Sequence, residues 1–143
     1  MTIKATDYHH VRLTVRDIAT SRKFYDDVFG FDVAFEAPPA DADEATKEAL
    51  AFLFGGVIYQ FGGGLLGLRP VAPGDDSFTE DRSGLDHLSF SVAGLSDLHD
   101  AAATLDGLGI AHEGVKDLGD AGIAILEFRD PDNIALEISG PNS

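Results

Sequence analysis

Cysteine is absent from the 143-residue chain, which excludes disulfides, thiolate metal sites and cysteine nucleophiles. Basic residues are scarce: 10 lysines and arginines stand against 25 aspartates and glutamates, and the net charge of −15 disfavours nucleic acid and anionic lipid as partners. No apolar run approaches the roughly 20 residues of a membrane span. No basic segment followed by an apolar one opens the sequence, so a secretory signal is not expected either. These absences favour a cytoplasmic protein.

The residues that are present suffice for one domain spanning 1–143. Hydrophobic residues make up 44% of the chain and include 10 phenylalanines, enough for a real core. The length leaves no room for separate catalytic and regulatory domains.

An internal repeat organises the sequence. Residues 8–17 (YHHVRLTVRD) and 85–94 (LDHLSFSVAG) align when His10 is set on His87, and the same alternation of apolar residues then begins both halves. A helical pattern follows each segment and ends at a glycine, Gly30 or Gly109, as expected for a helix that stops in the left-handed conformation. Strand-like segments then follow in each half: 31–36, 57–61 and 65–70, then 110–115, 122–129 and 134–139.

The expected fold is therefore α+β, with two βαβββ modules that form a cupped mixed sheet. The modules are expected at about 7–70 and 85–141, joined by a linker over 71–84. The stretch 38–56 has no counterpart in the second half. Its apolar residues favour a short inserted helix, with an extension of a strand through 50–54 as the alternative.

Alternation along the expected strands assigns side chains to faces. One set of polar side chains is expected on the face that the helices do not cover. Its members are His10, Arg12, Thr14, His87, Ser89, Ser91 and Glu137. If the two sheets curl together, His10, His87 and Glu137 converge as a metal site with open coordination positions. The alternative is that this face simply meets water. Of the other histidines, His9 is expected to pack on the helix side and His99 to be exposed in a helix. His112 is expected at the start of a strand, and none of the three is assigned a catalytic role.

Several segments resemble the vicinal-oxygen-chelate superfamily, which includes glyoxalase I, methylmalonyl-CoA epimerase, extradiol dioxygenases, and fosfomycin- and bleomycin-resistance proteins. The resembling segments are HVRLTVRD (10–17), SRKFY (21–25), FGF (29–31) and FRDPDNIALE (128–137). The resemblance implies metal ligands at His10, His87 and Glu137. The fourth ligand position of the family falls on Gly67, so glyoxalase I and epimerase activities are not expected.

The remaining three-ligand pattern is similar to that of the extradiol dioxygenases and the fosfomycin transferases. It implies one divalent ion (Fe, Mn, Ni or Zn) and a small oxygen-chelating substrate, with dioxygenase-, lyase- or transferase-like chemistry. The chain lacks the tryptophan segment of the fosfomycin transferases, and the additional acid/base histidine of the dioxygenases is not placed. Substrate-orienting groups are expected at Arg12, Thr14, Ser89, Ser91 and Arg69.

The alternative function is that of a metal-free bleomycin-resistance-type protein that sequesters a small molecule. The acidic charge fits a cationic small molecule. The presence of all three metal-ligating residues does not fit a metal-free protein. Resemblance to the family also implies a homodimer, in which the modules pair either within one chain or across two.

Overall fold

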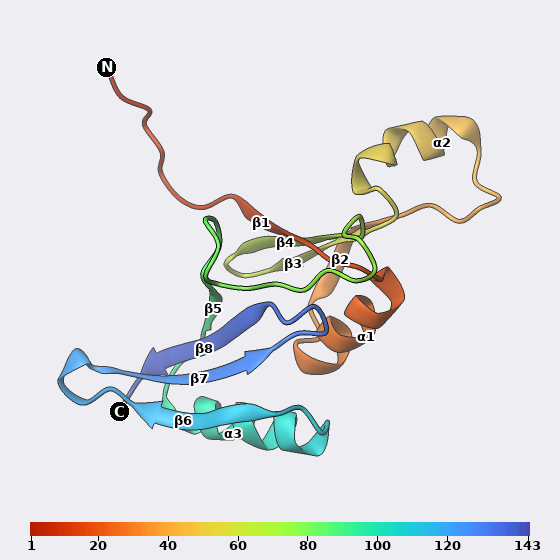
Figure 1. The fold of residues 1–143 in the computed structure, drawn as a ribbon. Helices are drawn as coiled ribbons and strands as arrows, with labels where there is room; N and C mark the ends of the chain where they lie inside the picture. The colour runs from red at the N-terminus through yellow and green to blue at the C-terminus, as the bar shows by residue number, and fades with distance from the viewer. The chain divides into compact units, whose positions relative to one another are not determined.

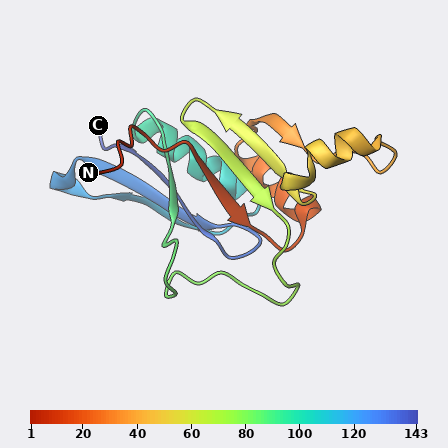
Figure 2. The same ribbon diagram turned by 90° about the horizontal axis from the view of Figure 1, so that it is seen from above.

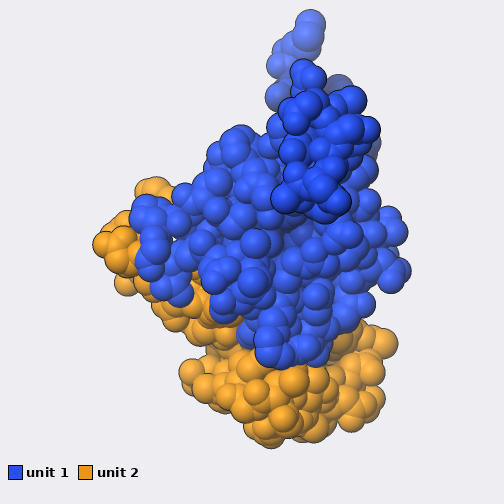
Figure 3. Space-filling view, turned by 90° about the vertical axis from the view of Figure 1, so that its right-hand side faces the viewer, with its two compact units in different colours: residues 1–74 blue, residues 75–143 orange.

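A computed structural model describes all 143 residues, and the chain divides into two compact units, Met1–Gly74 and Asp75–Ser143 (Figure 3). Each unit contains a helix and a four-stranded mixed sheet. The strand orders are β1-β4-β3-β2 and β5-β8-β7-β6, the same order in both halves. The α+β class and the repeated βαβββ organisation predicted from the sequence are therefore confirmed.

Unit 1 carries the insertion between its second and third strands. Its elements are β1 (His10–Thr14), α1 (Ile18–Val28), β2 (Asp32–Glu36), α2 (Glu44–Ala49), the 3-10 turn η1 (Ala51–Leu53), β3 (Val57–Phe61) and β4 (Gly64–Arg69). β1 runs parallel to β4, as the two neighbouring arrows in Figure 2 show, and the other pairs are antiparallel.

Unit 2 repeats this plan without the insertion. Its elements are β5 (Leu88–Ser91), α3 (Leu95–Gly107), β6 (His112–Asp117), the 3-10 turn η2 (Gly119–Ala121), β7 (Ile123–Arg129) and β8 (Ala135–Pro141). β5 is parallel to β8, and α3 lies against β6, β7 and β8. Strand β6 begins two residues later than predicted, because the Ile110 N–H still donates to the Leu105 carbonyl of α3 at 2.9 Å.

The helices begin and end at the predicted signals. The Asp17 side chain accepts a hydrogen bond from the Ala19 N–H at 3.0 Å and caps α1. Gly30 and Gly109, which follow α1 and α3, have φ values of 61° and 71°, the left-handed conformation that terminates helices. None of the helices has the length and apolar character that crossing a membrane requires.

Each core lies between the sheet and its helix, on the apolar face that the alternation predicts. In unit 1 the fully buried side chains include Val15, Tyr25 and Tyr59, and in unit 2 they include Leu98 and Leu126. A buried side chain of this size contributes about 1.5–3 kcal/mol relative to an exposed one. The polar residues of the same strands are thereby left on the opposite face.

The inserted helix exists, but its predicted apolar face does not reach the core. Ala45 and Ala49 of α2 are exposed, and only Leu53 of η1 is fully buried. Figure 1 shows α2 projecting beyond the sheet of its own unit. A helix of six residues presents less than two turns, so a single anchor at its end replaces a continuous buried stripe.

The segment 75–84, expected as part of the linker, belongs to unit 2 and is hydrogen-bonded to the rest of that unit. The Phe78 N–H donates to the carbonyl of Asp132 at 2.9 Å. Two Arg129 nitrogens donate to the Glu80 carboxylate at 2.6 and 2.9 Å. These hydrogen bonds lower the pKa of Glu80 to about 2, so the ion pair holds this segment on β7 throughout the neutral and mildly acidic range.

Candidate functional site

Two of the three predicted metal ligands meet within unit 2. His87 immediately precedes β5, and Glu137 lies in the neighbouring strand β8, where Ser89 is its register partner. The Nε2 atom of His87 is 3.9 Å from Oε2 of Glu137. The His87 side chain is 46% exposed and that of Glu137 13% exposed, so the pair opens to one side of the sheet. We call these two residues the His87–Glu137 pair.

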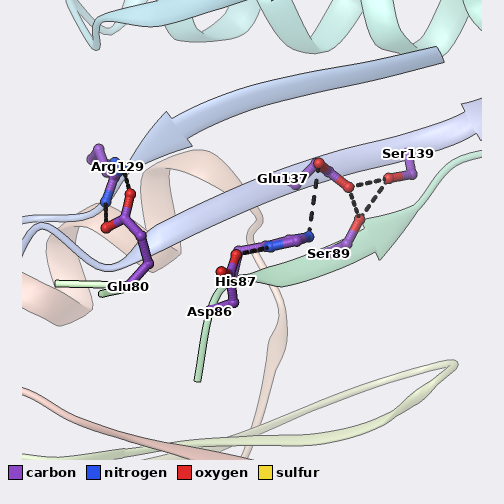
Figure 4. A network of polar contacts seen from close by, with 7 residues as sticks. All are labelled: Glu80, Asp86, His87, Ser89, Arg129, Glu137 and Ser139. Carbon is purple, nitrogen blue, oxygen red and sulfur yellow. Dashed lines mark hydrogen bonds and ion pairs between the residues drawn. The ribbon is translucent and has the colours of Figure 1, made fainter. Parts of the chain in front are cut away.

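Neighbouring side chains hold the other polar atom of each member of the pair (Figure 4). Nδ1 of His87 is 2.6 Å from the Asp86 carboxylate. Oε1 of Glu137 accepts hydrogen bonds from the hydroxyls of Ser89 at 2.9 Å and Ser139 at 2.7 Å. The two atoms that face each other, Nε2 and Oε2, are therefore the ones with capacity left.

The charge around His87 follows from this arrangement. The hydrogen bond to Asp86 is the largest cause of a raised His87 pKa; burial opposes it, and the negative charge of Glu137 adds to it. A carboxylate on one ring nitrogen fixes which nitrogen is presented to a ligand, as it does in carboxylate–histidine–metal arrangements.

The donor set fits a divalent cation. Imidazole nitrogen and carboxylate oxygen bind such ions at about 2.0–2.2 Å, so two ligands of one ion lie about 3–4 Å apart. The separation of 3.9 Å between Nε2 and Oε2 falls in this range. Three or more His, Cys, Asp or Glu side chains are not gathered into one cluster in the structure, so the pair supplies two of the three expected ligands. His10, the third predicted ligand, begins β1 in unit 1.

Unit 1 carries a different pair at the corresponding register. Arg12 of β1 is the partner of Gly67 in β4, as Ser89 is of Glu137. A Cβ atom at position 67 would lie 2.9 Å from Cγ of Arg12, so the arginine stem occupies the space over the glycine. The Arg12 Nη2 donates to the carbonyl of Phe52 at 2.7 Å. The pKa of Arg12 is lowered, first by burial and then by the positive charge of Arg69.

The other predicted substrate-orienting residues are distributed over both units. Arg69, at the end of β4, places its guanidinium 4.3 Å from the centre of the Phe54 ring. Thr14 is the register partner of Arg69 and is exposed, and Ser91 is exposed in β5. The Ser89 hydroxyl donates a hydrogen bond to Glu137 and thereby orients its carboxylate.

The remaining histidines separate into different roles. The prediction that His9 packs on the helix side is wrong: it precedes β1, outside the cover of α1, and is exposed with Nδ1 2.9 Å from Nδ1 of His10. His99 is exposed in α3, as predicted. His112 accepts a hydrogen bond from the Gly114 N–H at Nδ1, while its Nε2 is 2.8 Å from the Asp106 carboxylate. His112 therefore ties α3 to β6.

Asp86 and Ser139 are the polar partners that sequence reasoning does not single out. A signal exists for each. Asp86 is adjacent to His87 in sequence, and Ser139 follows Glu137 by two residues on the same strand face. Neither residue is distinctive until β5 is known to lie beside β8.

Known proteins share both the sequence pattern and the fold. The uncharacterized protein YaeR of Escherichia coli (strain K12) is 30% identical over 130 residues, which cover 91% of this chain and 92% of YaeR. A glyoxylase/bleomycin resistance protein/dioxygenase domain from Frankia sp. EAN1pec has a TM-score of 0.72 at 30% identity, covering 97% of this chain and 93% of that one. The fosfomycin resistance protein FosX from Listeria monocytogenes has a TM-score of 0.69 over 96% of this chain and 95% of its own; at 12% identity it shares the fold alone.

The family model agrees with these relatives. It describes the Glyoxalase/Bleomycin resistance protein/Dioxygenase superfamily and matches residues 7–138, nearly the whole of both units. The chain therefore belongs to the glyoxalase/bleomycin resistance protein/dioxygenase superfamily, as the resemblance in its sequence predicted.

Proposed function

We propose that this protein is a metal-dependent enzyme of the superfamily and acts on a small molecule that chelates the ion through neighbouring oxygens. His10, His87 and Glu137 would hold one divalent ion (Fe, Mn, Ni or Zn), in a cytoplasmic homodimer. Members of the superfamily typically use a divalent metal.

One observation carries this proposal: Nε2 of His87 and Oε2 of Glu137 face each other 3.9 Å apart, while the other polar atom of each side chain is held by its neighbours. Asp86 occupies Nδ1 of His87, and two serines occupy Oε1 of Glu137. Outer contacts of this kind orient metal ligands and increase their basicity. A surface ion pair contributes little to stability, so a role in stability alone would not explain three side chains that hold this pair in place.

The bound ion would polarise a substrate oxygen and stabilise negative charge that develops on it. The protein's own contribution is to orient the ligands and to leave coordination positions open. Gly67 provides no carboxylate in unit 1 where unit 2 has Glu137, so the chain lacks a proton-transferring group at that position. This favours dioxygenase-, lyase- or transferase-like chemistry over that of glyoxalase I.

The second candidate is a metal-free protein that sequesters a cationic compound. The observation that favours it is the net charge of −15, which attracts cations. It does not account for the supported His87–Glu137 pair, and so it ranks second.

Metal analysis of purified, untagged protein tests the proposal. The protein is incubated with each ion, desalted and analysed by plasma mass spectrometry. We expect stoichiometric retention of one of the ions and its loss in the His87→Ala variant. The matched control is His99→Ala, which removes an exposed histidine from α3 of the same unit.

Wild-type protein that retains none of the four ions would contradict the enzyme proposal. Thermal shifts with cationic drugs would then test sequestration, because a ligand that binds only the folded state raises the melting temperature. Equal loss of metal in both histidine variants would point to general destabilisation, which circular dichroism of the variants detects.

A further inference from the structure

The internal repeat allows one unit of this protein to be compared with the other. At one register of the sheet, unit 2 has Ser89 beside Glu137, while unit 1 has Arg12 beside Gly67. A carboxylate that can bind a cation is thus replaced by a guanidinium that can bind an anion. The register pair therefore carries a positive charge in unit 1 and a negative charge in unit 2.

Arg12 is held in place by its surroundings. Its stem fills the space over Gly67, where even a Cβ atom would approach Cγ of Arg12 to 2.9 Å. Nη2 donates to the Phe52 carbonyl at 2.7 Å, and Nε is buried with no hydrogen-bond partner. Because a buried N–H without an acceptor is unfavourable, the guanidinium can still gain a hydrogen bond from a ligand.

Arg69 provides a second positive charge on the same sheet. It is the register partner of Thr14, which lies two residues along β1 from Arg12 on the same face, and its guanidinium is 4.3 Å from the centre of the Phe54 ring. Phe54 adopts a left-handed conformation with φ of 53°, and its side chain is 55% exposed. Residues held in sparsely populated backbone conformations cluster at active sites and ligand clamps.

Neither arginine is neutralised by the protein. Five other basic side chains form ion pairs with carboxylates: Arg22, Lys23, Lys47, Lys116 and Arg129. No ion pair joins Arg12 or Arg69 to a carboxylate, although the chain has 25 acidic residues. Two like charges on one face of the β1–β4 pair are stabilised by an anion that contacts both, since oxyanions accept charge-assisted hydrogen bonds from guanidinium groups.

We infer that Arg12 and Arg69, here called the arginine pair, bind an oxyanion group of the substrate, a carboxylate or a phosphate. An apolar or aromatic part of the same molecule would contact Phe52 and Phe54, which are both exposed beside the pair. The inference deepens the proposed function. It rests on that proposal only in identifying the bound anion as part of the substrate. Binding of the anion itself requires no metal.

Calorimetric titration of phenyl phosphate into chelator-treated protein tests the inference. We expect saturable binding that weakens about tenfold or more in Arg12→Met and in Arg69→Met, since each variant loses charge-assisted hydrogen bonds. Methionine keeps most of the apolar stem. The matched control is Arg22→Met in α1, whose arginine is already paired with Glu36, and it should bind phenyl phosphate as the wild type does.

Additional probes separate the parts of the ligand. Inorganic phosphate should bind more weakly than phenyl phosphate, because it lacks the ring, and phenol should bind more weakly still. Benzoate compares a carboxylate with a phosphate. Gly67→Ala supplies a second variant that keeps both arginines: the added methyl group displaces the Arg12 stem and should also weaken binding.

The outcomes distinguish this inference from the proposed function. Phenyl phosphate binding that survives His87→Ala, while metal binding is lost, supports a separate anion site. Binding that appears only when metal is present would overturn the inference and leave the metal proposal intact. Unchanged affinity in Arg12→Met and Arg69→Met would overturn it directly. Wild-type protein that binds phenyl phosphate but retains none of the four ions after incubation would support the inference and count against the proposed function.

Discussion

At the scale of single residues, Asp86 decides which nitrogen of His87 is presented to a ligand. Its carboxylate is 2.6 Å from Nδ1, so the proton is held there and Nε2 is left as the donor atom. An amide in the same place keeps the shape but removes the charge that strengthens the imidazole as a ligand.

Replacement of Asp86 by asparagine is therefore expected to weaken metal binding about 10- to 100-fold, the usual effect of losing such a partner. Competition against a fluorescent chelator measures the change in affinity. The control is Asp106→Asn, which alters the other histidine–carboxylate contact of unit 2, 2.8 Å from His112. Equal effects of the two substitutions would assign Asp86 a role in stability only.

The shared face of the His87–Glu137 pair was predictable because strand alternation assigns side chains to faces without knowledge of the fold. His87, Ser89 and Glu137 lie on the side opposite Phe90 and Ile138, which are buried. The contribution of Arg12 was only partly predictable. Its face follows from alternation, but its position over Gly67 depends on the pairing of β1 with β4, which alternation does not specify.

At the scale of elements, α1 is joined to the sheet of unit 1 by a hydrogen bond between side chains. Tyr59 of β3 is fully buried, and its hydroxyl donates to the Asp26 carboxylate of α1 at 2.8 Å. Burial is the main cause of a raised Tyr59 pKa, and the hydrogen bond to Asp26 adds to it. The folded protein therefore favours the neutral phenol more strongly than the unfolded chain does.

Replacement of Tyr59 by phenylalanine should lower the free energy of unfolding by about 1 kcal/mol at neutral pH, the typical net value of one hydrogen bond. Because the pKa of Tyr59 is raised, its stabilising effect is fully present below the ordinary tyrosine value of 10.0 and is lost as the pH rises from there toward the raised pKa. Urea unfolding at increasing pH should therefore show a smaller alkaline loss in the variant than in the wild type. Tyr8→Phe, at an exposed tyrosine, should change neither the free energy of unfolding at neutral pH nor its loss at alkaline pH.

The ends of α1 and α3 were predictable from local signals, Gly30 and Gly109, which both adopt the left-handed conformation. The placement of α2 was not, because Ala45 and Ala49 are equally compatible with a buried or an exposed face. Local sequence specifies a short helix through its cap: the Asp43 side chain accepts a hydrogen bond from the Thr46 N–H at 2.7 Å. Only tertiary contacts decide what such a helix covers.

At the scale of the whole molecule, the connection between the two units is short. The Ala72 N–H donates to the carbonyl of Val15 in unit 1, and the Phe78 N–H donates to that of Asp132 in unit 2. Residues 73–77 are therefore the only stretch between these two attachments. Short connections between similar units favour their exchange between copies of a chain. We expect His10 of one chain to share an ion with His87 and Glu137 of a second copy.

A mixture of two variants that are each expected to lose metal tests this arrangement. A chain with His10→Ala and a chain with His87→Ala each lack one ligand in every site, so neither homodimer should retain metal. In a mixed dimer with exchanged units, one site loses both histidines and the other keeps all three ligands. Mixed dimers isolated through two different affinity tags should thus bind about half as much metal as the wild-type dimer. Mixed dimers without metal would show that each site is formed within one chain, because no pairing of these two chains could then restore a complete ligand set.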